Sequence, residues 1–293
     1  MGQITTDGGI TLEYETLGSH SDPPLMMIAG FGSQLVSWPR EFCQLLADGG
    51  RYVISSDNRD CGLSTKMDGQ VPDMEAISAA AHAGDWELAR SLAPYTFSDL
   101  ANDTFGLLDG LGIEKAHLLG ASMGGMIAQT MAIERPQRVL SLISMMSTTG
   151  EPDVGRSEPE ALAALMTPGP PDREGYIESA KKVLVWHSKR YPELEEAREV
   201  AALSYDRCYY PESGLRNFAA IIASGSRADG LRQLALPTLV IHGVDDTLIT
   251  PYGGERTAEL VPGARLLMVE DMGHDRPKPL WPLLREAILE HTA

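Results

Sequence analysis

Residues 116–128, AHLLGASMGGMIA, decide the fold of this chain. They begin as an apolar segment typical of a buried strand and continue as a segment typical of a helix. Between the two, Gly120, Ser122 and Gly124 match G-x-S-x-G, in which an abrupt strand-to-helix turn strains its middle residue and lifts that side chain above the sheet. We therefore predict that Ser122 is a nucleophile at a helix N-terminus, where free N–H groups favour developing negative charge. The alternative is a glycine-rich turn that merely packs tightly.

Apolar runs of strand length recur on both sides of this stretch. Runs without alternation suit parallel strands covered on both faces, and they lie at residues 25–29, 52–56, 139–145, 238–242 and 264–269. Helical patterns lie between them at residues 38–49, 74–83, 86–92, 97–111, 253–260 and 280–291. Ser98 is the expected N-cap of the helix at 97–111, and residues 4–17 are expected to form a hairpin. The alternation predicts a doubly wound, mostly parallel α/β sheet.

Residues 148–230 interrupt this rhythm, because they contain no convincing strand. Prolines separate helical patterns near residues 158–166, 173–188, 193–209 and 215–224. A helical block inserted after a strand of an α/β sheet is expected to cover the edge where ligands bind. We therefore predict a core domain of residues 1–147 and 231–293, and a helical cap, or lid, of residues 148–230.

Composition excludes several classes of partner. The 24 Lys and Arg residues and 41 Asp and Glu residues of the 293-residue chain give a formal net charge of −17. Nucleic acid and anionic membranes are therefore not expected partners, and a neutral or cationic small molecule is favoured over an anionic one. The alternative is that the acidity only serves solubility. No apolar run approaches the length of a membrane helix, and oligomeric state is not predicted.

The cysteines and the N-terminus bear on the compartment. The three cysteines are far apart, odd in number and without metal-ligand spacing, which favours a reducing compartment and no metal site. The N-terminal residues show no basic region followed by an apolar run, so no signal peptide is expected. A cytoplasmic protein is the simplest expectation.

A serine nucleophile needs a base, and the base needs an orienting acid, in the chain order Ser, Asp or Glu, His. Of seven histidines, only His274 follows the last predicted strand in a short loop before the terminal helix. We therefore predict His274 as the base, and we expect His242, within a strand, to be structural and His187 to lie on a helix outside the sheet core. Asp245 and Asp246 both follow a strand. Asp246 is favoured because the catalytic acid must lie beyond the end of the strand and its first turn.

Two backbone N–H groups are expected to stabilise the oxyanion. One belongs to Met123, which follows the nucleophile, and the other to Phe31, in the loop after the strand at 25–29. An ordinary turn at residues 30–32 is the alternative. Residues 57–64 are expected to shape the sheet edge through a turn and an internal ion pair between Asp57 and Arg59. The following side chains are candidates for an apolar pocket or plain core: Met145, Met146, Trp186, Tyr209 and Tyr210.

Taken together, these motifs resemble the α/β-hydrolase superfamily over nearly the full chain. The matching segments are residues 30–32, 57–64, 120–125, 237–246 and 273–274. Within the superfamily, residues 38–42, 46–50 and 108–112 are similar to esterases akin to aclacinomycin methylesterase, which act on a carboxymethyl ester of a glycosylated polyketide. The resemblance implies an α/β-hydrolase fold and places the catalytic acid at Asp246. Ala29 departs from it, since many relatives have His before the oxyanion glycine.

The sequence therefore predicts a serine ester hydrolase of the methylesterase or carboxylesterase kind, without metal or cofactor. Ser122 attacks the ester carbonyl, His274 carries the proton and Asp246 orients the imidazole. The alternatives are a C–C bond hydrolase, a lactonase or a perhydrolase with the same three residues, and a non-catalytic ligand receptor on the same fold.

Overall fold

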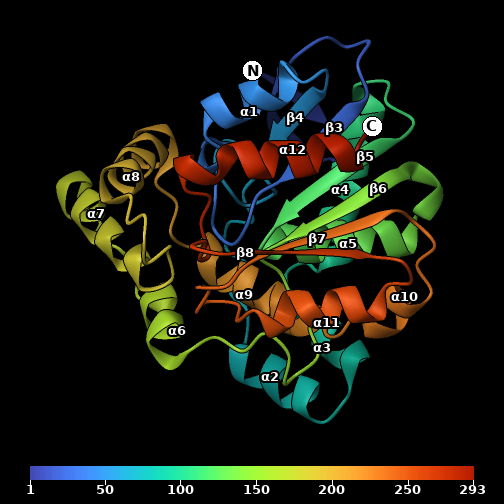
Figure 1. The fold of residues 1–293 in the computed structure, drawn as a ribbon. Coiled ribbons are helices and arrows are strands. Elements are labelled where there is room, and N and C mark those ends of the chain that lie inside the picture. Colours follow the sequence, from blue (N-terminus) through green and yellow to red (C-terminus); the bar gives the residue numbers. More distant parts are fainter.

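The computed structural model describes all residues 1–293 and shows one eight-stranded sheet in the order β1-β2-β4-β3-β5-β6-β7-β8 (Figure 1). The strands are β1 (Gly2–Thr5), β2 (Thr11–Leu17), β3 (Pro24–Ile28), β4 (Tyr52–Ser56), β5 (Ala116–Ala121), β6 (Val139–Met145), β7 (Thr238–Gly243) and β8 (Arg265–Val269). The β1–β2 hairpin and the β2–β4 pair are antiparallel, and every other pair is parallel. The predicted mostly parallel sheet is therefore confirmed.

Burial explains why the central strands read as unbroken apolar runs. Every residue of β4, β5 and β7 is buried, because helices cover both faces of the sheet. On one face lie α1 (Arg40–Ala47) and α12 (Trp281–His291), whose Phe42 and Trp281 rings have centroids 5.5 Å apart. On the other face lie α4 (Phe97–Gly110), α5 (Met123–Glu134) and α11 (Tyr252–Leu260). The sheet thus separates two hydrophobic cores.

Only helices follow β6 before the sheet resumes at β7. They are α6 (Pro159–Met166), α7 (Arg173–Ser179), the 3₁₀ helix η3 (Ala180–Val185), α8 (Leu194–Cys208), α9 (Ser213–Ser224) and α10 (Ala228–Arg232). In Figure 1, α6, α7 and α8 stand together beside the sheet, whereas α9 contacts α2 (Met74–His82), α3 (Trp86–Leu92) and α4. None of the chain's helices combines the length and apolarity that crossing a bilayer requires.

One predicted helix is shorter than expected. The pattern at 173–188 predicts a single helix, but regular α-helix ends at Ser179 and tightens into η3. The chain then leaves the helix so that the carbonyl of Trp186 can accept a hydrogen bond from the N–H of His274, at 2.6 Å. A tertiary contact therefore overrides the local helical pattern.

The expected N-cap of α4 is also wrong by two residues. Phe97 is the first helical residue, and Thr96 takes the extended cap conformation with φ −123°. The carboxylate of Asp99 accepts a hydrogen bond of 2.8 Å from the Thr96 N–H, as in a capping box. The hydroxyl of Ser98 instead donates to Glu134 on α5.

The ion pair expected inside residues 57–64 is absent. Asp57 is fully buried, and its carboxylate is 2.6 Å from Arg207 of α8. Arg59 points away toward α4, where it forms a bidentate pair with Asp103. The turn is held as expected, because the Ser64 hydroxyl donates to the Asp57 carbonyl. Residues two apart in this loop face different helices, so each finds its partner far along the chain.

Candidate active site

Ser122 lies at the sharp turn between β5 and α5. Its backbone angles, φ 56° and ψ −123°, are strained for a residue with a side chain. The flanking glycines allow the turn: a Cβ on Gly120 would lie 2.1 Å from the carbonyl oxygen of Gly124, and one on Gly124 would lie 2.0 Å from that of Ile28. The geometry expected for G-x-S-x-G is therefore present, with Ser122 at the N-terminus of α5.

His274 and Asp246 meet beside this turn. The His274 Nδ1 atom is 2.6 Å from one carboxylate oxygen of Asp246. The other oxygen accepts hydrogen bonds of 2.9 Å from the N–H groups of Leu248 and Ile249, which fix the carboxylate. Burial alone would raise the pKa of Asp246, but the imidazoles of His274 and His242 facing it hold that pKa below its usual value. Asp246 is therefore ionised and can stabilise an imidazolium at His274.

The neighbouring aspartate takes a different partner. The Asp245 carboxylate lies 3.2 Å from the ammonium of Lys189, and it also accepts a hydrogen bond from the Lys189 N–H. It thus links the loop after β7 to the segment between η3 and α8. Of the two carboxylates that the sequence offers, only that of Asp246 contacts His274.

His242 lies within β7, as expected, and its Nε2 atom is 3.4 Å from the carboxylate of Asp246. Its Nε2 atom donates a hydrogen bond of 2.8 Å to the Ile249 carbonyl, since a carbonyl can only accept. The ring is fully buried, and its Nδ1 atom has no partner.

The expected oxyanion groups have free N–H bonds. No carbonyl or side chain of the protein accepts a hydrogen bond from the N–H of Phe31 or of Met123. For Met123 this follows from its place as first residue of α5, where helix N–H groups lack internal acceptors. The loop of Phe31 lies against Ser122, since a Cβ on Gly30 would be 3.2 Å from the Ser122 Cβ.

A cavity of about 630 Å³ connects these groups. Ser122, His274 and Phe31 line it together with side chains of the segment between β6 and β7. Of the apolar candidates from the sequence, Met146, Trp186, Tyr209 and Tyr210 line this cavity. Met145, which is fully buried within β6, is not among the lining residues.

Several further titratable side chains line the cavity, among them Cys61 and His187. Burial raises the pKa of the Cys61 thiol to about 12, so this thiol stays protonated and is a poor nucleophile. Burial, together with the charges of His274 and Arg276, lowers the pKa of His187 to about 3. His187 is not on a helix, as its position in the sequence suggests, but follows η3 and lies 3.7 Å from Asp275. No local pattern indicates this placement.

No group of three or more His, Cys, Asp or Glu side chains is arranged to hold a metal ion. Around Ser122 the site offers a hydroxyl, an imidazole with its carboxylate, and backbone N–H groups. This set suits acyl transfer through a nucleophile.

Comparison with known proteins assigns the fold to a family. Residues 23–275 match the family model described as alpha/beta hydrolase fold. Rhodomycin D methylesterase DnrP of Streptomyces peucetius is 28% identical over 311 residues, covering 99% of this chain and 97% of that protein. The enol-lactonase from Burkholderia xenovorans LB400 superposes with a TM-score of 0.72 at 22% identity and covers 99% of both chains. The meta-cleavage product hydrolase CumD of Pseudomonas fluorescens IP01 has a TM-score of 0.75 at 20% identity, covering 99% of this chain and 97% of its own.

Proposed function

This chain belongs to the α/β-hydrolase family, and from that premise we propose that it is a serine hydrolase that cleaves a carboxylic ester. The observation that carries the proposal is the 2.6 Å contact between His274 and an ionised Asp246, at a cavity that Ser122 also lines. The name methylesterase of a relative that spans nearly the whole chain supports an ester over other acyl compounds.

In the first half of the reaction, Ser122 Oγ attacks the ester carbonyl carbon while His274 Nε2 takes the hydroxyl proton. The carbonyl π electrons move to oxygen, and the N–H groups of Phe31 and Met123 stabilise the resulting oxyanion. When the tetrahedral intermediate collapses, the C–O bond to the alcohol breaks. The alcohol leaves with the proton from His274, and the acyl group stays on Ser122.

In the second half, water replaces the alcohol. His274 takes a proton from water, the hydroxide attacks the acyl carbon, and a second oxyanion forms at the same N–H groups. Its collapse breaks the bond to Ser122 Oγ, which recovers its proton from His274. Asp246 keeps the His274 Nδ1 atom protonated throughout, so that Nε2 is the atom that exchanges the proton.

We propose a small, neutral or cationic ester as the substrate, hydrolysed in the cytoplasm. The formal net charge of −17 disfavours an anionic substrate, and the cavity volume of about 630 Å³ suits a small molecule. Aromatic side chains such as Tyr176 and Tyr209 line the cavity on the side of α7 and α8 and offer an apolar surface to the substrate.

Hydrolysis of an ester panel tests the proposal. p-Nitrophenyl acetate and butyrate, and methyl esters of larger carboxylic acids, are supplied to the wild-type chain and to Ser122→Ala. We expect rapid wild-type turnover and a fall of at least about a thousandfold in the variant. Ser98→Ala, whose hydroxyl lies on the surface of α4, is the matched serine control and should keep wild-type activity.

Three outcomes contradict the proposal. Ester turnover that survives in Ser122→Ala removes the proposed nucleophile. A wild-type chain that cleaves a dienone C–C bond but no ester supports the C–C hydrolase alternative. A chain that a fluorophosphonate probe does not label is the result expected of a ligand receptor.

A further inference from the structure

The side-chain amide of Asn217 joins two parts of the structure. One is the oxyanion loop, residues 30–35, which contains Phe31, and the other is a buried polar cluster of Tyr95, Asp60 and Arg216. Asn217 lies on α9 and is 1% exposed. Its Oδ1 atom accepts a hydrogen bond of 3.1 Å from the Gly32 N–H, one residue after the expected oxyanion donor Phe31. Its Nδ2 atom donates one of 2.7 Å to the Tyr95 hydroxyl. The amide therefore contacts the loop on one side and the cluster on the other.

The donors and acceptors around Asn217 allow only one orientation of its amide. The Gly32 N–H can only donate, so it requires the amide oxygen. On the other side, the Tyr95 hydroxyl has one proton, which goes to the carboxylate of Asp60 at 3.1 Å, because an ionised carboxylate can only accept. The Tyr95 oxygen must then accept from the Nδ2 atom of Asn217. The cluster thus determines which amide atom faces the oxyanion loop.

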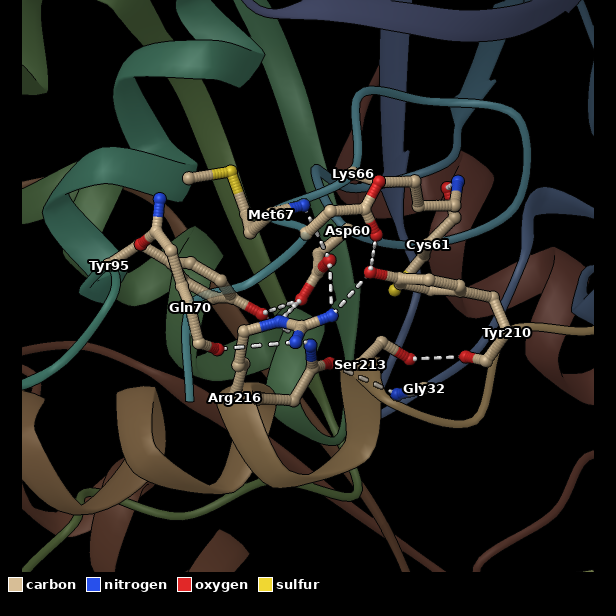
Figure 2. A network of polar contacts seen from close by, with 12 residues as sticks. Gly32, Asp60, Cys61, Lys66, Met67, Gln70, Tyr95, Tyr210, Ser213 and Arg216 are labelled. Atoms are coloured by element: carbon tan, nitrogen blue, oxygen red, sulfur yellow. Dashed lines mark hydrogen bonds and ion pairs between the residues drawn. The ribbon is translucent and has the colours of Figure 1, made fainter. Parts of the chain in front are cut away.

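Asp60 is the fixed end of this chain of hydrogen bonds. It is fully buried, and Arg216 of α9 binds both of its oxygens, at 2.6 and 3.0 Å. The Met67 N–H also donates to it, at 3.0 Å. Figure 2 shows the Arg216 guanidinium between Asp60, the Gln70 carbonyl and the Tyr210 hydroxyl. Because these partners all hold the Asp60–Arg216 ion pair, the Asp60 carboxylate cannot rotate to release the Tyr95 hydroxyl without breaking several hydrogen bonds.

The Gly32 N–H belongs to the central peptide of a tight turn. Gly30 and Ser33 are its ends, since the Ser33 N–H donates to the Gly30 carbonyl at 3.2 Å. Gly32, at the third position, has φ +60°, which fits a type II turn and excludes type I. The two turn types differ by a rotation of the peptide between Phe31 and Gly32. The Phe31 N–H belongs to the preceding peptide of the same turn, between Gly30 and Phe31, so its position relative to Ser122 depends on the turn being held in place as a whole.

We propose that Asn217 is a positioning residue: by accepting the Gly32 N–H it anchors the turn at residues 30–33, and with that turn the Phe31 N–H, at the oxyanion, and Tyr95 and Asp60 hold its amide. This inference rests on the proposed esterase function. Asn217 contacts no reacting atom. Its effect is therefore expected in the transition state, where the oxyanion carries charge, and much less in ester binding.

The test compares Asn217→Ala with a variant of the same helix. Removing an oxyanion donor outright costs about a hundredfold to a thousandfold in kcat, so a displaced donor should cost about tenfold or more. KM should change by less than about threefold, because the ground-state carbonyl gains little from this N–H. Ser224→Ala is the matched control: Ser224, also on α9, accepts a hydrogen bond of 2.9 Å from the Phe97 N–H, far from the loop, and its variant should keep wild-type kcat and KM.

Binding of a boronic acid, which forms an anionic tetrahedral adduct with the serine, gives a second readout. Its affinity for Asn217→Ala should fall by the same factor as kcat/KM, which a loss of folded protein alone would not produce. Tyr95→Phe keeps the Asn217 amide but frees its Nδ2 atom, so it should lower kcat less than Asn217→Ala does. Because both act through one chain of bonds, the double variant should lose no more than Asn217→Ala. If Asn217→Ala does not fold, the kcat of Tyr95→Phe and its affinity for the boronic acid test the positioning role.

The outcomes separate this inference from the function on which it rests. A wild-type chain without ester turnover contradicts the proposed function, and the positioning role is rejected with it. An active wild-type chain whose Asn217→Ala variant keeps kcat within about twofold contradicts the positioning role alone. Equal losses in Ser224→Ala and Asn217→Ala, or additive losses in the double variant, would likewise overturn it. Unchanged kcat and boronic acid affinity in Tyr95→Phe overturn it if the alanine variant is unfolded.

Discussion

Replacing Asp246 with asparagine should remove activity while leaving the shape of the site unchanged. The structure fixes how the new amide must lie. One carboxylate oxygen of Asp246 accepts hydrogen bonds from the N–H groups of Leu248 and Ile249, so the amide oxygen must take that position. The amide NH₂ then takes the other position, 2.6 Å from His274 Nδ1 in the wild-type chain.

The substitution forces His274 into the wrong tautomer. An NH₂ group can only donate, so His274 Nδ1 must become an acceptor and the proton must move to Nε2. A protonated Nε2 cannot take the proton of Ser122. In serine hydrolases of this type the corresponding change lowers kcat by about ten-thousandfold, which is about 5 kcal/mol of transition-state stabilisation. We expect a loss of this size in kcat/KM for Asp246→Asn.

The assay is hydrolysis of p-nitrophenyl butyrate by the wild type, Asp246→Asn and Asp245→Asn. Asp245 is the matched control because it is adjacent in sequence and pairs with Lys189 instead of His274. Its variant should keep activity within about threefold, since a partly exposed ion pair contributes about 1 kcal/mol or less. The reasoning is refuted if Asp246→Asn stays within about tenfold of the wild type, or if Asp245→Asn loses as much.

Two further predictions concern stability. Burial lowers the pKa of His117 to about 4. Between pH 6.5 and 4, the His117 imidazole is therefore protonated in the unfolded chain but neutral in the folded chain. As the pH drops through this range, the free energy of unfolding falls by up to about 3 kcal/mol. His117→Gln can still bond Ser141 and should show a smaller loss of Tm between pH 7 and pH 4.5; an unchanged loss contradicts this. A Cβ in Gly124→Ala would lie 2.0 Å from the Ile28 carbonyl oxygen, so we expect a loss of about 4 kcal/mol or no folded protein in thermal melts, whereas in Gly8→Ala the nearest atom is 3.7 Å away. Equal melting temperatures for the two glycine variants would show that the turn is not tight.

Local pattern predicts the sheet and the main candidate residues because both depend on short segments. The apolar runs at residues 52–56 and 139–145 coincide with β4 and β6. Parallel strands end at the same edge, so loops that follow separate strands bring Ser122 and His274 to one cavity even though 152 residues separate them. Asp246 joins them through its contact with His274. Their types and their places after strands are visible in the sequence.

Partners of buried polar side chains are not visible in the same way. The sequence suggests that Asp57 pairs with Arg59, two residues away, but its partner is Arg207, 150 residues away. Asn217 carries no signal either, because a single amide within a helical pattern is typical of an exposed face. Such pairs depend on where helices pack against the sheet, and helix packing is set by shape over the whole molecule and not by local periodicity.

The loop after β4 illustrates how these distant pairs shape the active site. Asp57 lies at the start of this loop and contacts both the oxyanion loop and α8. One carboxylate oxygen accepts a hydrogen bond of 2.7 Å from the Leu35 N–H, and the other is 2.6 Å from Arg207 of α8. Gln34 reinforces the link, because its amide donates to carbonyls of α8. The end of the oxyanion loop is therefore tied to a helix whose side chains line the cavity.

The start of the oxyanion loop is tied to the same β4 loop by a second carboxylate. Asp60 binds Arg216 of α9, and the neighbouring Asn217 holds the Gly32 N–H. Both ends of residues 32–35 thus depend on buried carboxylates of one loop and on two consecutive helices of the segment between β6 and β7. Since α8 and α9 shape the cavity while they support this loop, a substitution that shifts either helix to fit a new substrate should also move the proposed oxyanion donor, the Phe31 N–H. Substrate range and catalytic rate are therefore expected to change together in this chain.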